Sequence, residues 1–131
     1  MFISYIKGYI MRFALLLKVL ALILRIASKR NEDFKRFIGT VSVKIAIKTK
    51  NNKGRTFIFN NGSVSSTRSL KQYDAALVFS DAKTGFTVLK EGTQEASFYA
   101  AATGTLYVEG MAFFIQWFND AVTIAMKKNK K

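Results

Sequence analysis

The stretch Val41-Ser42-Val43-Lys44-Ile45-Ala46-Ile47-Lys48 alternates between branched apolar residues and mostly polar ones. Side chains of a strand point alternately to its two faces, so this alternation predicts a β-strand that carries its Val and Ile residues on one face. Residues 49–54 have turn composition, and Arg55-Thr56-Phe57-Ile58-Phe59 resumes the β pattern, which predicts a hairpin. Asn60-Asn61-Gly62 predicts a second tight turn into a strand over residues 63–67. The sequence therefore predicts a three-stranded meander.

Helices and two further strands are expected around this meander. Asn31 can cap a short helix over residues 32–38, and either Ser80 or Asp81 can cap a helix that ends at Gly92. Of the other acidic residues, Asp74 is expected in a turn and Glu109 at an exposed strand position. The remaining expected elements are a buried strand over 75–79, a short helix or loop over 94–103, a strand over 105–109 and a helix over 111–126.

Composition excludes several classes of enzyme. The chain has 131 residues, half of them hydrophobic, which fits one compact domain. It contains neither Cys nor His, so zinc sites, thiol nucleophiles, Ser-His-Asp triads and imidazole catalysis are all excluded. The carboxylates are scattered singly apart from Glu32-Asp33, which are better placed to stabilise a helix amino terminus. We therefore expect a protein that is not an enzyme and uses no metal or cofactor.

The net charge of +13 is unevenly distributed. Residues 1–55 carry +11, residues 56–126 carry −2 and residues 127–131 carry +4. The cations flank or lie inside the most apolar segments, which favours an anionic membrane over nucleic acid as the partner. Nucleic-acid binding would use the cations of the first hairpin, which a solvated strand face explains equally well. These cations are Lys44, Lys48, Lys50, Lys53 and Arg55.

Residues 9–28 are apolar except for three cations and Ser28, and no Gly or Pro interrupts them, which predicts one continuous helix. Most cations of this segment fall in one narrow stripe, and Arg12 and Arg30 lie off it, near the two ends. We favour a helix lying in the plane of a membrane. The alternatives are a spanning helix, a secretory signal, and a helix packed on its own domain or on a second copy. The predicted membrane-contact residues are Lys7, Arg12, Lys18, Arg25, Lys29 and Arg30.

The helix over 111–126 is apolar around more than half of its circumference, and it carries four of the chain's aromatic residues. Such a helix is either covered on most sides or lines a cavity that holds an apolar guest. Aromatic stripes usually fill cores, so periodicity alone leaves both interpretations open.

Two segments resemble the sterol carrier protein 2 lipid-transfer domain. One is Ala75-Ala76-Leu77-Val78-Phe79-Ser80-Asp81 followed by a helix ending at Gly92, and the other is Phe98-Tyr99 leading to Gly104-Thr105-Leu106-Tyr107-Val108-Glu109-Gly110-Met111. The resemblance covers about residues 31–126. It implies an α+β fold with a five-stranded, mainly antiparallel sheet, helices covering one face, and an apolar tunnel for sterols, fatty acyl chains or other lipids.

Three features depart from that family. Gly85 lies inside a helix, residues 100–103 lengthen a connection, and the amino-terminal helix is unusually apolar and basic. The last departure suggests a membrane-associated member, similar to the accessory proteins of isoprenoid-quinone biosynthesis. On this interpretation residues 1–30 are a membrane-associating amphipathic helix, residues 31–126 the lipid-binding domain and residues 127–131 a basic tail.

We therefore expect non-catalytic binding of a sterol, fatty acyl or isoprenoid lipid at a membrane surface, by a cytoplasmic protein that is peripheral or anchored by one helix. The alternative is a scaffold with a filled core that binds a partner protein of a membrane-bound biosynthetic complex. Membrane-bound enzymes, or a second copy bound through residues 1–30, are further expected partners. The predicted lipid-binding residues are Phe57, Phe59, Leu77, Phe79, Phe86, Leu89, Phe98, Leu106, Val108, Phe113, Phe114, Trp117 and Phe118.

Overall fold

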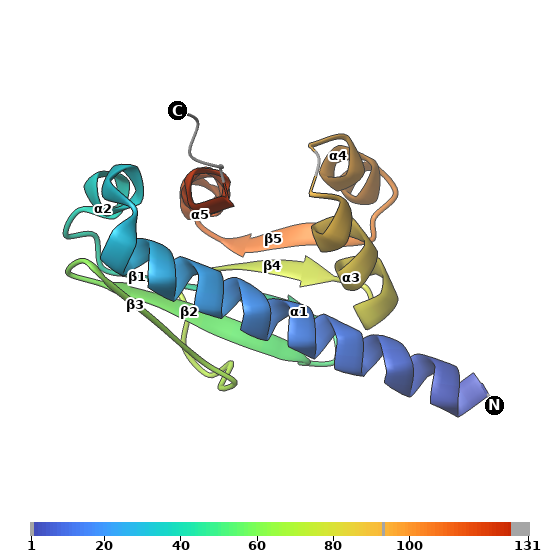
Figure 1. The fold of residues 1–131 in the computed structure, drawn as a ribbon. Helices are drawn as coiled ribbons and strands as arrows, with labels where there is room; N and C mark the ends of the chain where they lie inside the picture. The colour runs from blue at the N-terminus through green and yellow to red at the C-terminus, as the bar shows by residue number, and fades with distance from the viewer. Residues whose placement is uncertain (1, 93, 127–131) are drawn as a thin grey trace.

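The computed structural model describes residues 2–92 and 94–126, with the backbone alone for residues 2–7 and residue 94. Helices and strands follow the predicted order closely (Figure 1). The elements are α1 (Phe2–Arg30), α2 (Glu32–Ile38), β1 (Val43–Thr49), β2 (Gly54–Asn60), β3 (Ser63–Thr67), β4 (Ala75–Phe79), α3 (Ala82–Glu91), α4 (Gln94–Ala102), β5 (Leu106–Gly110) and α5 (Ala112–Met126).

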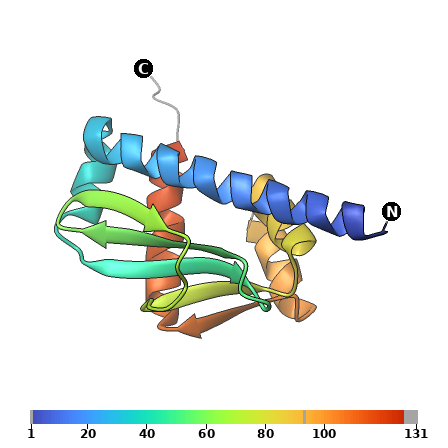
Figure 2. The same cartoon turned by 90° about the horizontal axis from the view of Figure 1, so that it is seen from below.

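The five strands form one sheet in the order β3-β2-β1-β4-β5. Neighbouring strands are antiparallel except β1 and β4, which run parallel. The helices cover one face of this sheet; α1 runs alongside β2 and β3, and α5 crosses the strands (Figure 2). The predicted fold class, an α+β fold with a mainly antiparallel five-stranded sheet, is confirmed.

The two turns of the meander have the backbone that their residues predict. Asn61 and Gly62 both have positive φ, 49° and 90°, which gives the turn between β2 and β3 the twist that a tight hairpin needs. At the first hairpin, Gly54 pairs with Lys48, and a Cβ at Gly54 would overlap the carbonyl oxygen of Ile47. Only glycine fits this approach of β2 to β1, so the hairpin register depends on it.

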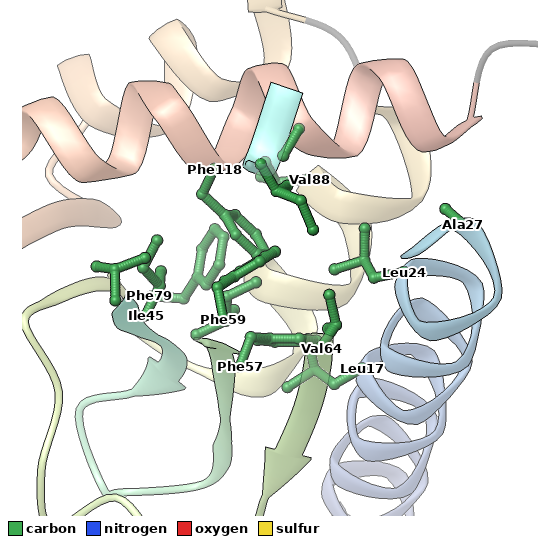
Figure 3. Packing of buried hydrophobic residues seen from close by; sticks show 14 of the residues in the cluster. Leu17, Leu24, Ala27, Ile45, Phe57, Phe59, Val64, Phe79, Val88 and Phe118 are labelled. Atoms are coloured by element: carbon green, nitrogen blue, oxygen red, sulfur yellow. The ribbon is translucent and has the colours of Figure 1, made fainter. Parts of the chain in front are cut away.

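The main core lies between the covered face of the sheet and the helices (Figure 3). The β1–β2 register places Phe59 opposite Val43 and Phe57 opposite Ile45, so the predicted apolar face of β1 continues onto β2. Phe118 of α5 is buried against these strands. Each large side chain buried in this way contributes about 1.5–3 kcal/mol to folding.

One side of α1 belongs to the same core. Phe13, Leu17, Leu24 and Ala27 are buried, and the helix contacts α2, α3, β2 and β3. The predicted division into a membrane helix over residues 1–30 and a separate domain over residues 31–126 therefore does not follow the packing. The reason is that the apolar circumference of α1 has two sides, and the sheet buries one of them. The predicted basic tail, residues 127–131, lies outside the described residues.

Gly85 of α3 explains how α1 packs so closely. A Cβ at this position would lie 2.6 Å from Cε1 of Phe13, which is closer than carbon atoms approach. The Phe13 ring also packs edge-on against Phe79, with ring centroids 6.3 Å apart. Gly85 costs α3 about 1 kcal/mol of intrinsic helix stability relative to Ala. In exchange, it leaves room for the aromatic ring of α1.

The other face of the sheet is partly covered by the loop over residues 68–74. Leu70 and Tyr73 from this loop pack over Ala46, Ala76 and Val78, which are all buried. Ala46 is therefore buried although it lies on the mostly polar face of the predicted strand. This second apolar cluster fixes the connection that leads from β3 across to β4.

A cluster of polar side chains also fixes the loop over residues 68–74 to the sheet. The Tyr73 hydroxyl donates a hydrogen bond of 2.7 Å to Oε1 of Glu109, and Nζ of Lys48 lies 3.9 Å from the same oxygen. The hydrogen bond, burial and the nearby negative charge raise the pKa of Tyr73 to about 12. Glu109 was predicted at an exposed position; it is half-buried, because the loop covers it and supplies its partner.

Candidate lipid-binding site

The helix layer leaves part of the sheet uncovered at β5. The β4–β5 register places Val108 opposite Leu77 and Leu106 opposite Phe79, so all four side chains lie on the helix-covered face. Leu106 is buried, but Val108 is 40% exposed. Val108 faces the helix layer and is still exposed to solvent, so the helices do not cover the sheet at this position.

Further apolar side chains are exposed on the helices beside this strand. Phe98 of α4 and Phe113 of α5 are each 68% exposed, and Met111 between β5 and α5 is exposed as well. Both helices contact β5, and they stand at opposite ends of it (Figure 1). We call Phe98, Val108, Met111 and Phe113 the β5 surface. These four side chains are exposed apolar residues on β5 and at its two ends. Exposed apolar surface of this kind is found at sites that bind apolar ligands or partners.

The deeper aromatic residues fill the core with their own rings. The Phe118 ring centroid lies 5.3 Å from that of Phe57 and 6.0 Å from that of Phe59. Trp117 packs edge-on against Phe59 at 4.9 Å and stacks on Phe37 at 5.6 Å. Rings from β2 and α5 therefore fit between one another and fill this part of the interior, where the family resemblance implied a tunnel (Figure 3).

The predicted lipid-binding residues thus divide by burial, and the structure does not bring them together around one space. The buried ones are Phe57, Phe59, Phe79, Leu106 and Phe118. The half-buried ones are Leu77, Phe86, Leu89, Phe114 and Trp117. The exposed ones are Phe98, Val108 and Phe113. The last group, which belongs to the β5 surface, is the most exposed of the three.

A second exposed apolar feature lies on α1, on the side away from the sheet. At 100° per residue its members span an arc of about 80°, opposite the four core residues of this helix. We call it the α1 stripe, and its residues are Met11, Leu15, Val19, Leu22 and Ile26. The sequence pattern did not separate this stripe from the core side, because both carry Leu, Ile and Val at helical spacing.

The predicted membrane-contact cations lie on either side of this stripe. Lys18, Arg25 and Lys29 border one side, Arg12 and Arg30 border the other, and all five are exposed. The side chain of Lys7 lies outside the described ones. An exposed apolar stripe between two rows of cations is the arrangement expected of a helix lying in a membrane interface. Of the helices in residues 2–92 and 94–126, none is long and apolar enough to cross a membrane.

Comparison with known proteins supports the fold. No family model and no curated protein sequence matches the chain. Among solved structures, the UbiJ-SCP2 ubiquinone synthesis protein matches with a TM-score of 0.60 and 15% identity, over 84% of this chain and 91% of that chain. Sterol carrier protein 2 from Yarrowia lipolytica, in its apo form, matches with a TM-score of 0.56 and 19% identity, over 86% and 93%. Another sterol carrier protein 2 structure matches with a TM-score of 0.52 and 16% identity, over 82% and 93%.

These matches show that the chain has the fold of sterol carrier protein 2 domains. Residues 31–126 make up less than three-quarters of the chain, so the matched part extends beyond the region in which the sequence resemblance was seen. This agrees with the packing of α1 into the core of the domain.

Proposed function

We propose that this protein binds an apolar lipid without catalysis, at the surface of a membrane. The β5 surface would take the lipid, and the α1 stripe would rest in the interface of an anionic leaflet. The observation that carries the proposal is the exposure of Val108 on the helix-covered face, in a fold shared with proteins named sterol carriers.

The energetics of an apolar surface support a lipid of moderate size. Burial of about 300 Å² of apolar area gives roughly 7–8 kcal/mol before the costs of association, which is enough for micromolar binding. The exposed side chains of the β5 surface are all apolar. Such a surface selects by shape, so a sterol, a fatty acyl chain or an isoprenoid chain would suit it.

Charge supports membrane docking through α1. Each Lys or Arg near an anionic leaflet contributes about 1 kcal/mol, and five described cations border the α1 stripe. Phe13 and its buried neighbours hold the opposite side of the helix on the sheet. The protein would therefore dock as a rigid domain that is peripheral to the cytoplasmic face of the membrane, where membrane-bound enzymes could receive its lipid.

Lipid binding can be tested with two neighbouring residues of β5 that face opposite sides of the sheet. Val108→Asn alters the β5 surface, whereas Tyr107→Asn alters an equally exposed position on the other face. We expect the first variant to bind cis-parinaric acid and dehydroergosterol about tenfold more weakly and the second to stay within about twofold of the wild type. Mass spectrometry of lipid extracted from the purified protein should identify the natural ligand.

Two results would contradict this part of the proposal. Equal effects of the two variants would remove the β5 surface as the site. Absence of both extracted lipid and probe binding would instead favour the scaffold with a filled core.

Membrane docking needs a separate measurement. Leu22→Asp places a carboxylate in the α1 stripe, and Thr87→Asp adds the same charge to the exposed side of α3. In co-sedimentation with vesicles containing 30% phosphatidylglycerol, we expect Leu22→Asp to lose at least about tenfold in binding and Thr87→Asp less than about threefold. Equal losses would show that net charge alone, and not the stripe, drives binding.

A further inference from the structure

A groove lies between the amino-terminal half of α1 and the start of β2, and its volume is about 600 Å³. Met11, Leu15 and Leu17 of α1 supply apolar wall, and the small residues Gly8 and Ala14 widen the groove. A Cβ built on Gly8 would meet no other atom within 4 Å, so this end is open. The volume lies in the range of pockets that hold small ligands.

Four cations line the same groove: Arg12 and Lys18 from α1, Arg55 from β2, and Arg68 from the loop after β3. Among the side chains that the structure describes, none that lines the groove is acidic. The ion pairs of the described residues all involve other cations. Arg12 stacks on the Tyr9 ring, 5.5 Å from its centroid, which holds its guanidinium near the groove. The four cations therefore give the groove a positive electrostatic potential, which no acidic side chain among its described lining residues neutralises.

Arg55 is the unusual member of this group. Its register opposite Ile47 places it on the helix-covered face of the sheet, in line with Phe57, whereas Lys44 and Lys48 lie on the other face. It is half-buried, and its Nη1 donates a hydrogen bond of 2.7 Å to Oγ of Ser66. That bond accounts for one of the five N–H donors of a guanidinium. Partial burial of a charge is unfavourable unless an anion or polar group compensates for it.

We infer that this groove, which we call the Arg55 groove, holds one anionic phospholipid of the leaflet on which the protein docks. The phosphate would lie between Arg55 and Arg68, and an acyl chain would lie along the apolar wall of α1. The inference rests on the proposed membrane docking, because Met11 and Leu15 belong both to the α1 stripe and to this wall.

The chemistry of the groove selects this ligand. Guanidinium groups match the oxygens of a phosphate with pairs of parallel hydrogen bonds, which lysine cannot make. The apolar wall excludes a strongly hydrated ion as the best occupant, since a free phosphate would leave the wall uncovered. An anionic lipid satisfies both parts at once.

The test uses the full chain and a monomeric lipid, so that it does not depend on a bilayer. Dihexanoyl phosphatidylglycerol below its critical micelle concentration is titrated while the Arg side-chain and Met methyl resonances are followed by NMR. We expect saturable shifts at Arg55 and Met11, and at least tenfold weaker binding of dihexanoyl phosphatidylcholine. Arg55→Gln together with Arg68→Gln should weaken phosphatidylglycerol binding by at least about tenfold.

The matched control removes the same charge outside the groove. Lys53→Gln and Lys71→Gln change exposed cations close in sequence to the two arginines, and neither lysine lines the groove. This double variant should bind within about threefold of the wild type. Arg55→Lys keeps the charge and loses the paired hydrogen bonds, so it should bind more weakly than the wild type and more tightly than Arg55→Gln. Urea unfolding of each variant checks that its fold is intact.

Three results would overturn the inference: equal losses in the two double variants, no saturable shift at Arg55, or equal binding of inorganic phosphate. A failure of the proposed function has a different signature. In that case the short-chain lipid would still bind in the Arg55 groove. However, Val108→Asn would not alter binding of the lipid probes, or Leu22→Asp would not alter binding to vesicles.

Discussion

The contact between Gly85 and Phe13 makes an unusual mutational prediction. In an exposed helix, Gly→Ala stabilises by about 1 kcal/mol. At position 85 the new methyl group would lie 2.6 Å from Cε1 of a fully buried ring. Overpacking of this kind costs about 1–3 kcal/mol. We therefore expect Gly85→Ala to lower the free energy of unfolding by up to about 2 kcal/mol, against its helix propensity.

The cause can be isolated by shortening the partner. In a Phe13→Leu background the ring is gone, so Gly85→Ala should recover its helix propensity and stabilise by about 1 kcal/mol. The sign of the same substitution would then differ between the two backgrounds. The expected coupling energy is about 2 kcal/mol, within the range measured for residues in direct contact.

Urea unfolding followed by circular dichroism measures all four members of this cycle. Thr87→Ala is the control, because it raises the helix propensity of α3 at an exposed position and should act equally in both backgrounds. A stabilising Gly85→Ala in the wild-type protein, or equal effects in the two backgrounds, would refute the docking of α1 against α3.

Three other substitutions test local features. The Asn31 side chain accepts a hydrogen bond from the first turn of α2, so Asn31→Ala should lower the free energy of unfolding by about 1 kcal/mol in urea; no change would exclude the cap. Gly92 and Gly110 both have positive φ, but only a Cβ at Gly110 would also overlap the Asp74 carbonyl oxygen. We expect Gly92→Ala to lower the free energy of unfolding by about 1–2 kcal/mol and Gly110→Ala to lower it clearly more. Equal shifts of the thermal unfolding midpoint in the two variants would contradict this expectation. The folded pKa of Tyr73 is raised to about 12, so its contribution is complete below pH 10 and is lost as the pH rises through 12. The stability difference between wild type and Tyr73→Phe should therefore shrink over that interval, and a constant difference would contradict the raised pKa.

Much of the secondary structure could be predicted because its signals are local. Asn31 caps α2 through the Phe34 N–H, as the sequence indicates. The sequence allowed either Ser80 or Asp81 to cap α3, and Asp81 does so through the Thr84 N–H. Alternation over residues 41–48 predicted both β1 and its buried face. These signals depend on the period of the backbone and on a few hydrogen bonds, so they are readable without knowledge of the fold.

The placement of α1 and of the candidate sites depends on distant contacts. Leu17 and Leu22 are chemically alike, but Leu17 is buried and Leu22 is exposed, because the sheet lies on one side of the helix only. The position of Arg55 on the covered face follows from its pairing with Ile47. Likewise, periodicity could not decide whether the aromatic rings enclose a space or fill it, since that depends on how β2 and α5 fit together.

Helix α1 is synthesised before the elements that bury its core-facing side, and this order affects how the nascent chain behaves. Its core-facing side packs on β2, β3 and α3, which all follow it in the sequence. At about 5–20 residues per second, the ribosome needs roughly 3–12 s to make the ~60 residues between the end of α1 and the end of α3. During that interval both apolar sides of the nascent helix are uncovered, so a bilayer or a chaperone can engage it before the sheet exists to receive it.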